Sequence, residues 1–462
     1  MEAETTETTE ATEATELVLD KAFVDSVIQA VEGGDADRVH ELLEPLHAAD
    51  VADLLEQIGA GDRDELIRLW GRRIDGHTLS ELDDSVREPL LEVLPPEVLA
   101  DALRELDSDD VVDLVEDLEE AQQSRILGVL ELGDRVGVES SLSYPEYSAG
   151  RLMQRELVAL PEDWTVGQAI DFVRAADELP DQFYHVMLVT PAMKPVGYVA
   201  LGRLLSSKRD HALMDIAEPS YRTVNVNDPE ADVAYLFNHY HLISTPVVDE
   251  DGRLVGMITI DDAMAVLDEE HEEDLLRLAG VDEDSSLADT VFQTTKGRAV
   301  WLTVNLVTAI VASMVIDLYA ETIDQMVALA VLMPIVASMG GNAGTQTMTV
   351  AVRAIATREL TAANALRVTW REITVGGING LLFGLVMAGV AGFWFGVPML
   401  AAVIALAMVL TLIAAALGGI VIPIVLDRFG IDPALASGPF VTTVTDVVGF
   451  FAFLGIASAV LL

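Results

Sequence analysis

The chain has 462 residues, of which 76 are acidic and 27 basic, and it contains no cysteine. Up to Thr290 there are 68 acidic and 20 basic residues, whereas residues 291–462 hold only 8 and 7. A water-soluble polyanion is therefore followed by a near-neutral apolar block, which predicts an integral membrane protein with two to four domains. Disulfides, thiolate metal sites and cysteine nucleophiles are excluded.

Most of the acidic residues have a general explanation. The chain has only four lysines, arginine supplies nearly all of the positive charge, and the acids are scattered over the soluble part. This composition suits the cytoplasm of a halophile, where carboxylates hold hydration and salt screens their mutual repulsion. A count of carboxylates is therefore weak evidence for a metal site.

The N-terminal third is predicted to be helical. Residues 1–20 form a Glu/Thr/Ala tract without the apolar core of a signal peptide, and we expect a disordered acidic tail there. Over residues 21–140, apolar residues recur at helical spacing between Gly-Asp and Pro-Pro breaks. The run 49–55 (ADVADLL) returns at 109–115 (DDVVDLV), with a looser copy at 95–103. Such repeats predict helix pairs stacked into a superhelix, although other helical bundles also look repetitive.

Two matching halves follow, at 141–210 and 211–268, in which strand and helix patterns alternate. The clearest match is between 195–201 (PVGYVAL) and 254–260 (LVGMITI). Each half is predicted to contain a short strand, a helix, two strands joined by a turn, and a closing helix. The tandem resembles a CBS-domain pair, a regulatory module that commonly binds nucleotides or ions.

A long connector helix is predicted at 269–296, continuing the closing helix of the second half. Its acidic run places Asp268 and Glu272, and likewise Glu269 and Glu273, four residues apart. Like charges at this spacing on a helix repel unless cations are present. A solvated acidic face on a halophilic protein explains the same run equally well.

Five apolar spans are predicted in the transmembrane domain, residues 297–462. They cover 300–319, 323–339 and beyond, 373–395, 398–426 and 434–462. Basic residues lie before the first span, between the second and third, and between the fourth and fifth, whereas the other connections carry none. This distribution predicts a multi-pass protein of the cell membrane with a cytoplasmic N-terminus and an outside C-terminus.

The second span contains the stretch 334–347, PIVASMGGNAGTQT. Glycine and proline this dense at membrane depth favour a distorted helix whose carbonyls face protein or water. Close helix crossing through small residues is the alternative. The polar side chains of Asn342, Thr345 and Gln346 favour the wall of a polar pathway.

The last span holds one charge, Asp446, which is the only charged residue in 433–462. An aspartate in hydrocarbon costs roughly 2.5–3.5 kcal/mol on insertion scales, so a cation or a wet cavity must stabilise it. We therefore predict that Asp446 is the ion site of a transport pathway. The alternative is a carboxylate that only holds helices together through Thr442, Thr443 or Thr445.

From about residue 20 to its end, the chain resembles the MgtE magnesium channels. The resemblance rests on the order of the domains together with the runs 339–346 (MGGNAGTQ) and 438–446 (GPFVTTVTD). Supporting runs lie at 144–153 and 274–281. The resemblance implies a multidomain membrane protein with an all-α N-terminal superhelix, an α/β CBS-domain pair, a long connector helix and a five-helix α transmembrane domain.

The same resemblance implies a homodimeric, Mg2+-selective channel with its pore on the twofold axis, closed when cytosolic Mg2+ is high. The positions that match its pore site are Asp446, Thr442, Gly449 and Asn342. The positions that match acids binding regulatory Mg2+ are Asp262, Glu270, Glu273 and Asp274. Ala265 and His241 stand where the family often has carboxylates, so at least one regulatory site is expected to be weaker, displaced or absent.

The expected ligands and partners follow from this resemblance. One Asp446 per chain, doubled by twofold symmetry, supplies two charges to a divalent ion, and Mg2+ accepts carboxylate and carbonyl oxygens while keeping much of its water. A nucleotide such as ATP is expected at the CBS pair. Membrane lipid, divalent cations and a second copy of the chain are the expected partners, and no nucleic acid is expected.

Other functions fit the sequence less well. A coupled secondary transporter of Mg2+ or Co2+ also uses broken midplane helices, but the spans offer no buried partner carboxylate for Asp446. A membrane-anchored CBS sensor has no need of five spans with a Gly-rich polar break. An enzyme is least favoured, because the chain has neither a Gly-Lys-Ser/Thr phosphate loop nor a nucleophile elbow. His239 and His241 lie two residues apart and are interpreted as ordinary side chains of the CBS module.

Overall fold

The computed structural model describes residues 19–461 except 117, 177–178, 181, 219 and 282–290. The chain divides into two compact units, Met1–Val266 and Leu267–Leu462. The first unit holds the N-terminal helices and the two matching halves, and the second holds the membrane helices. The predicted acidic tail falls almost wholly on residues 1–18, which lie outside the described residues.

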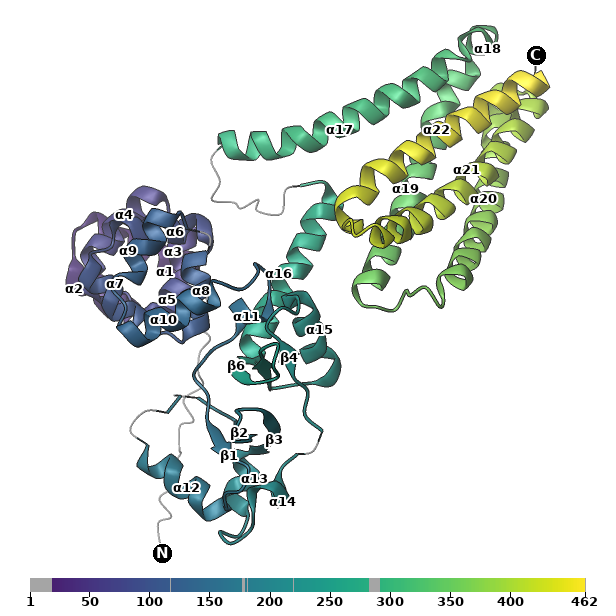
Figure 1. Ribbon diagram of the computed structural model, residues 1–462. Helices are drawn as coiled ribbons and strands as arrows, with labels where there is room; N and C mark the ends of the chain where they lie inside the picture. Colours follow the sequence, from purple (N-terminus) through teal and green to yellow (C-terminus); the bar gives the residue numbers. More distant parts are fainter. Residues whose placement is uncertain are drawn as a thin grey trace, which may run out of the picture. The chain divides into compact units, whose positions relative to one another are not determined.

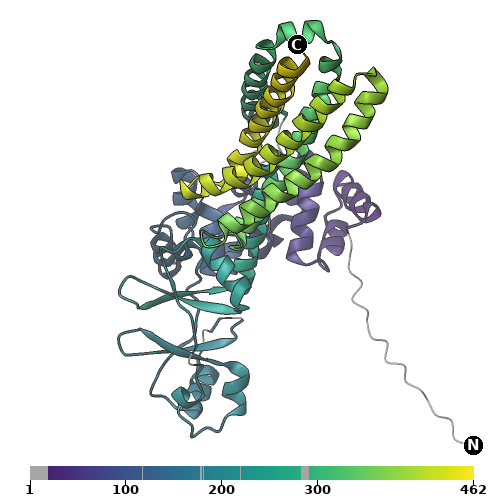
Figure 2. The ribbon, with the colours of Figure 1, turned by 90° about the vertical axis from the view of Figure 1, so that its right-hand side faces the viewer.

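The described part of residues 19–141 is built from short helices, in agreement with the helical spacing of its apolar residues (Figures 1 and 2). The helices are α1 (Lys21–Glu32), α2 (Ala36–Leu43), α3 (Ala48–Gln57), α4 (Ala60–Trp70), α5 (Gly76–Ser80), α6 (Asp84–Val93), α7 (Pro96–Leu103), α8 (Ser108–Glu116), α9 (Glu120–Leu127) and α10 (Leu132–Ser141), with a 3-10 turn at Gly71–Arg73. Asp20, Asp35 and Asp75 fix where α1, α2 and α5 begin, because their carboxylates accept backbone N–H groups of the first turn. The repeated runs 49–55 and 109–115 lie in α3 and α8.

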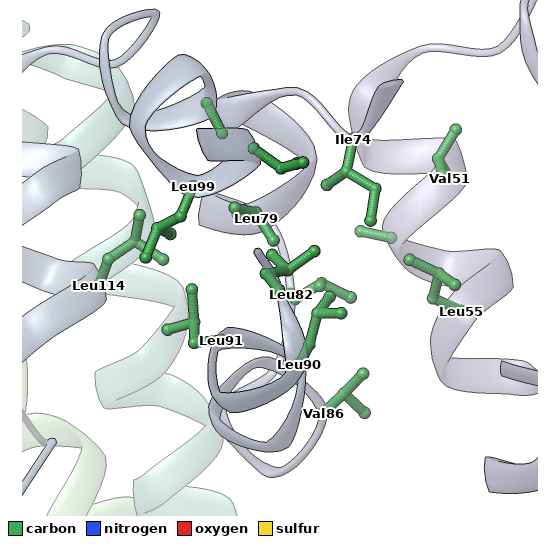
Figure 3. Close-up of a cluster of buried hydrophobic side chains, with 14 of the residues drawn as sticks. Val51, Leu55, Ile74, Leu79, Leu82, Val86, Leu90, Leu91, Leu99 and Leu114 are labelled. Carbon is green, nitrogen blue, oxygen red and sulfur yellow. The ribbon is translucent and has the colours of Figure 1, made fainter. Parts of the chain in front are cut away.

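These helices share one continuous apolar core (Figure 3). Leu79, Leu99 and Leu114, from α5, α7 and α8, belong to this core and are fully or almost fully buried. None of these helices is longer than 12 residues, so each buries its apolar stripe only by packing against its neighbours. This mutual dependence is what the sequence repeats predict.

Each matching half forms a three-stranded sheet, and the two sheets have the same topology. In the first, β1 (Ala159–Pro161) runs parallel to β2 (His185–Val189), which pairs antiparallel with β3 (Pro195–Ala200). The second repeats this arrangement, including a register shift at the end of the middle strand, with β4 (Val224–Asn225), β5 (Ser244–Val248) and β6 (Leu254–Thr259). The helices of this region are α11 (Ala149–Leu152), α12 (Val166–Ala175), α13 (Leu201–Ser206), α14 (Leu213–Ile216) and α15 (Glu230–Tyr240). The predicted duplication is confirmed.

The closing helix of the second half, α16 (Ile260–Ala279), continues across the boundary between the two units. It ends where Gly280 adopts φ +71°, a left-handed conformation that glycine reaches without strain. Residues 282–290 of the predicted connector lie outside the described residues, and residues 291–296 belong to the first membrane helix. The connector helix therefore ends earlier than the predicted bound at 296.

Five described helices are long and apolar enough to cross a membrane, the number predicted from the sequence. They are α17 (Val291–Asp317), α19 (Ala328–Ala356), α20 (Ala365–Phe395), α21 (Pro398–Arg428) and α22 (Pro433–Leu461). The short α18 (Ala320–Gln325) separates the first two, so the second long helix begins at Ala328 rather than at Ile323. The most buried of the five is α21, which packs against α19, α20 and α22 (Figure 1).

The Gly-rich stretch of the second span does not break its helix. α19 runs without interruption through Pro334 and the glycines that follow. A Cβ built on Gly340 lies 2.8 Å from the Thr411 Cγ2 atom of α21, and one on Gly344 lies 2.7 Å from the Val441 Cγ1 atom of α22. The expected distortion is therefore wrong, and close helix crossing accounts for these two glycines.

A second line of glycines joins α20 to α21. Gly376, Gly380 and Gly384 are spaced one turn apart on α20 and are buried. A Cβ added to them lies 2.6 Å from the Leu412 carbonyl oxygen, 2.7 Å from Val409 Cα and 2.7 Å from the Ala405 carbonyl oxygen, respectively. Because these neighbours are backbone atoms, they cannot move aside as a flexible side chain would, and only glycine permits this spacing.

Replacement of Gly380 with alanine is therefore expected to destabilise the membrane unit. Overpacking a tight contact costs typically about 1–3 kcal/mol. The matched control is Gly389→Ala on the same helix, where an added Cβ meets no heavy atom within 4 Å. Thermal unfolding of the detergent-solubilised chain, followed by tryptophan fluorescence, measures both. Equal midpoints for the two variants would contradict the close α20–α21 contact.

Candidate functional site

Asp446 lies near the middle of α22, a helix of 29 residues with no other charge. Its side chain is half-buried. Among the described residues, no hydrogen-bond donor or cation contacts its carboxylate. The protein thus presents a single carboxylate at membrane depth whose charge needs a partner from outside the described chain.

The threonines around Asp446 do not supply that partner. Thr442 Oγ1 donates to the Gly438 carbonyl oxygen at 3.0 Å, Thr443 Oγ1 to Pro439 at 2.6 Å, and Thr445 Oγ1 to Thr442 at 2.9 Å. Hydroxyls that bond to their own helix in this way do not bridge to another helix. The alternative in which threonines tie Asp446 into a helix contact is therefore not what the structure forms.

The other predicted pore positions differ in their surroundings. Asn342 is exposed on α19, and its Nδ2 atom donates to the Ser338 carbonyl oxygen at 2.9 Å, one turn earlier. Gly449 is buried, and a Cβ added to it lies 3.3 Å from Thr411 Cγ2. Thr411, which the sequence did not single out, thus lies against both Gly340 and Gly449. Its fully buried hydroxyl has no hydrogen-bond partner among the described residues.

Of the four predicted regulatory acids, Asp262 belongs to the first unit and lies near the start of α16. Its carboxylate accepts from the Thr259 hydroxyl at 2.6 Å and from the Thr259 backbone N–H at 3.3 Å. Burial, together with the charges of Asp261 and Asp110 and opposed by these hydrogen bonds, raises the pKa of Asp262 to about 7. The sequence prediction gave Asp262 no partners in the N-terminal helices.

Those partners are Asp109 and Asp110, at the start of α8. Asp109 is only 8% exposed, and burial, reinforced by the charge of Asp262, raises its pKa well above the usual range. Burial and the charge of Asp107 raise the pKa of Asp110 to about 6. Asp109 and Asp110 are the first two residues of the repeated run 109–115. No pattern in the sequence connects them with Asp262, some 150 residues later.

Glu270 and Asp274 lie one turn apart on α16, in the second unit. Burial raises the pKa of both carboxyls, and the charge of Asp432, in the loop between α21 and α22, raises both further. Arg277 counters this effect in each case. Asp432 was also missed in the sequence, although an aspartate directly before Pro433 is a typical helix start.

The fourth predicted acid, Glu273, already has a cation beside it. Arg277 Nη2 lies 2.9 Å from its carboxylate. Among residues 19–281 and 291–461, apart from the single-residue and two-residue gaps, no three His, Asp or Glu side chains lie close enough together to hold a metal ion. Of the predicted regulatory set, Glu270 and Asp274 thus form a pair near Asp432, Glu273 is paired with Arg277, and Asp262 has its acidic neighbours in the first unit.

The two positions that depart from the expected carboxylates have simple surroundings. Ala265 is exposed on α16. His241 forms the C-cap of α15 at φ +54°, and the neighbouring His239 stacks on Tyr235 at 5.3 Å between ring centroids. These contacts agree with an ordinary role for both histidines in the module.

Family models match three parts of the chain. They describe a divalent cation transporter (MgtE) at 333–456, the MgtE intracellular N domain at 46–147 and a CBS domain at 213–269. Together these matches cover α3 to α10, most of the second matching half, all of α20 and α21, and most of α19 and α22.

Curated proteins that are similar along most of their length carry a common name. A magnesium transporter MgtE of Thermus thermophilus is 31% identical over 452 residues, which cover 96% of this chain and 99% of the relative. A magnesium transporter MgtE of Bacillus subtilis is 29% identical over 78% of this chain and 79% of the relative. Among solved structures, the cytosolic domain of the Mg2+ channel MgtE in complex with ATP is 30% identical, with a TM-score of 0.49 over 53% of this chain and 99% of that chain.

The buried acids of the first unit generate a prediction of stability. A carboxyl whose pKa is raised by folding stabilises the fold below the pKa of the unfolded chain, about 3.9, and this contribution is lost as pH rises through the folded pKa. At pH 7.5 in a chelator, Asp109→Asn is therefore expected to raise the thermal midpoint of the cytosolic unit by about 2–4 °C. The control is Asp64→Asn, at an exposed position of α4. A lower midpoint in Asp109→Asn would show that the ionised carboxylate stabilises this contact.

Proposed function

This chain belongs to the MgtE family of divalent cation transporters, which are ion transporters and not enzymes, and we propose that it conducts Mg2+ into the cytoplasm and closes when cytosolic Mg2+ is high. The observation that carries the proposal is the Asp446 carboxylate, half-buried in an apolar helix and without a cationic or hydrogen-bonding partner among the described residues. A permeating cation is the partner that such a group requires.

The proposed pore site combines Asp446 with Thr442, Gly449 and Asn342. Mg2+ dehydrates reluctantly, so a pathway for it offers few direct ligands and many contacts to its water. A homodimer with the pore on its twofold axis brings two Asp446 carboxylates to one divalent ion. The long α17, which is exposed over most of its apolar length, leaves ample surface for lipid and for a second copy.

Closure at high Mg2+ is proposed to involve the acids of α16. Glu270 and Asp274 are half-buried, near the charge of Asp432, and burial raises the pKa of both. Like charges a few ångströms apart repel by about 1 kcal/mol or more in wet surroundings. A divalent cation that binds between two carboxylates turns this repulsion into a net attraction. Asp262, beside Asp109 and Asp110, gives the first unit a second acidic contact with the same response.

A nucleotide such as ATP is proposed as a further ligand of the CBS pair. The support is the ATP complex of the relative's cytosolic domain, together with the duplicated sheets of this chain. The orientation proposed here has the acidic first unit in the cytoplasm and the C-terminus outside, because the basic residues of the membrane unit lie before the first span, between the second and third spans, and between the fourth and fifth. The acidic composition supports a halophilic source.

The Asp446 assignment is tested by Asp446→Ala. This change removes the charge that holds the permeating ion, so Mg2+ uptake into proteoliposomes is expected to fall at least tenfold while the chain stays folded. The measurement is flux of Mg2+, Co2+, Ca2+ and Na+ reported by enclosed dyes. Thr443→Ala, which lies about one turn before Asp446 on the same helix and removes no charge, is the matched control for insertion.

Two outcomes separate the alternatives. Wild-type flux in correctly inserted Asp446→Ala protein refutes the pore assignment. Mg2+ uptake that depends on a gradient of H+ or Na+, and stops when that gradient is abolished, identifies a coupled secondary transporter instead of a channel.

The gating proposal is tested by Glu270→Gln combined with Asp274→Asn. Conduction is expected to persist, but closure should require several-fold more cytosolic Mg2+, because a ligand shifts a population only through its differential affinity for the two states. Single-channel open probability is measured against Mg2+ at fixed high KCl, which screens diffuse charge. The matched control is Asp268→Asn with Glu272→Gln, an exposed pair at the same spacing on the same helix. Overlapping inhibition curves for the two double variants would show that Glu270 and Asp274 are part of a solvated acidic surface and do not sense Mg2+.

A further inference from the structure

The carboxylate of Asp432 serves two helices at once. Its Oδ1 atom accepts the backbone N–H of Ala434 at 2.7 Å, in the first turn of α22. Its Oδ2 atom accepts from Arg277 Nη1 of α16 at 2.9 Å. One side chain in the α21–α22 loop thus caps the helix that carries Asp446 and holds the end of the connector helix.

Packing surrounds this ion pair. Arg277 and Asp432 are 19% and 32% exposed, and Arg277 also pairs with Glu273. Beside them, Leu278 of α16 packs against a small apolar cluster from α19 and α22, made of Met348, Val352, Ala434 and Val441. The pair is therefore sheltered from water, where a charge-assisted hydrogen bond is stronger than on an open surface.

The contact between Arg277 and the start of α22 requires the negative charge of Asp432. The N-terminus of a helix carries partial positive charge, so a guanidinium at the start of α22 is repelled unless an anion lies between them. Asp432 provides that anion, and its cap fixes its own position relative to the helix. A displacement of Arg277 therefore acts directly on the first turn of α22.

The helix α22 connects this contact with Asp446. Pro433 occupies the first helical position, where its fixed φ favours the helix start. Asp446 follows 14 residues after Asp432, about 20 Å along a helix at 1.5 Å per residue. The contact between the connector helix and Asp432 is thus joined to the proposed pore carboxylate, Asp446, through α22.

We propose that Arg277 is a positioning residue for α22, tying the connector helix through Asp432 to the helix that carries Asp446 and so stabilising the closed form. This inference rests on the proposed function, because it assumes that α16 is the element that responds to cytosolic Mg2+. When the connector leaves, Asp432 keeps its cap but loses its cation, so the ion pair favours the docked connector.

The test is open probability against cytosolic Mg2+ for the full-length chain in planar bilayers. Arg277→Met keeps an unbranched apolar side chain and removes the charged guanidinium. It is expected to raise the Mg2+ concentration for half-closure about three- to tenfold, the range for loss of a sheltered charge-assisted pair. Unitary conductance and the preference for Mg2+ over Na+ are expected to be unchanged, because Asp446 is untouched. The matched control is Arg371→Met, since the exposed Arg371 pairs only with its neighbour Glu372 among the described residues.

Variants of Asp432 separate coupling from folding. Asp432→Asn keeps an oxygen for the Ala434 cap but loses the charge, so it is expected to shift closure as Arg277→Met does without lowering the thermal midpoint. Asp432→Ala is expected to lower the midpoint as well, because the cap is lost. Arg277→Met with Asp432→Asn is expected to shift closure no further than either single change, as for two residues that act through one contact.

The outcomes distinguish this inference from the proposed function. If the wild type conducts and is closed by Mg2+ but Arg277→Met matches it, or if the Arg277 and Asp432 effects add, the positioning role is overturned and the gating proposal stands. If the wild type passes no Mg2+, or passes it without closure by cytosolic Mg2+, the proposed function itself fails.

Discussion

An aspartate inside an apolar helix, with no cation beside it in the described part of the chain, is the constraint on which the membrane unit depends. Asp446 can remain ionised there only if water or a cation reaches it, so the helices around it must leave a polar path and still pack firmly. The chain meets the second requirement with glycines. Gly340 and Gly344 bring α19 within van der Waals contact of α21 and α22. The polar side chains of the same stretch, such as Asn342 and Gln346, remain exposed on another face of α19.

The features that the sequence predicted well are those encoded locally. The five long helices follow from runs of apolar residues, and the two sheets follow from the repeated pattern that places β3 and β6 at matching positions. The Gly-rich part of α19 was misjudged because composition cannot tell a broken helix from a closely packed one. That distinction depends on Thr411 and Val441, which lie some 70 to 100 residues away in the sequence and beside Gly340 and Gly344 in space. Proline at 334 is accommodated within the helix.

The acids illustrate the same limit. With 76 acidic residues in the chain, the sequence could not say which of them leave the solvent. Asp262 was selected through a resemblance, but Asp109, its buried neighbour, comes from a distant helix, and only the fold brings the two together. Asp268 and Glu272 have the same spacing on α16 as Glu270 and Asp274, yet the first pair is exposed and the second is partly buried near Asp432. Burial, rather than number or spacing, separates acids that can respond to a cation from those that keep the surface hydrated.

The choice of residues at the start of α22 has a physical logic of its own. Glu270, Asp274 and Asp432 are three acids of like sign near one another, so without a cation they would push α16 away from the α21–α22 loop. Arg277 offsets that repulsion with a charge that the chain carries itself, and its planar fork contacts Glu273 and Asp432 together, which the single ammonium of a lysine does less well. Because one arginine faces several carboxylates, the contact keeps a net negative charge. A contact balanced in this way is close to the point at which one further divalent cation changes the preferred position of the helix, and this is the condition that a switch requires.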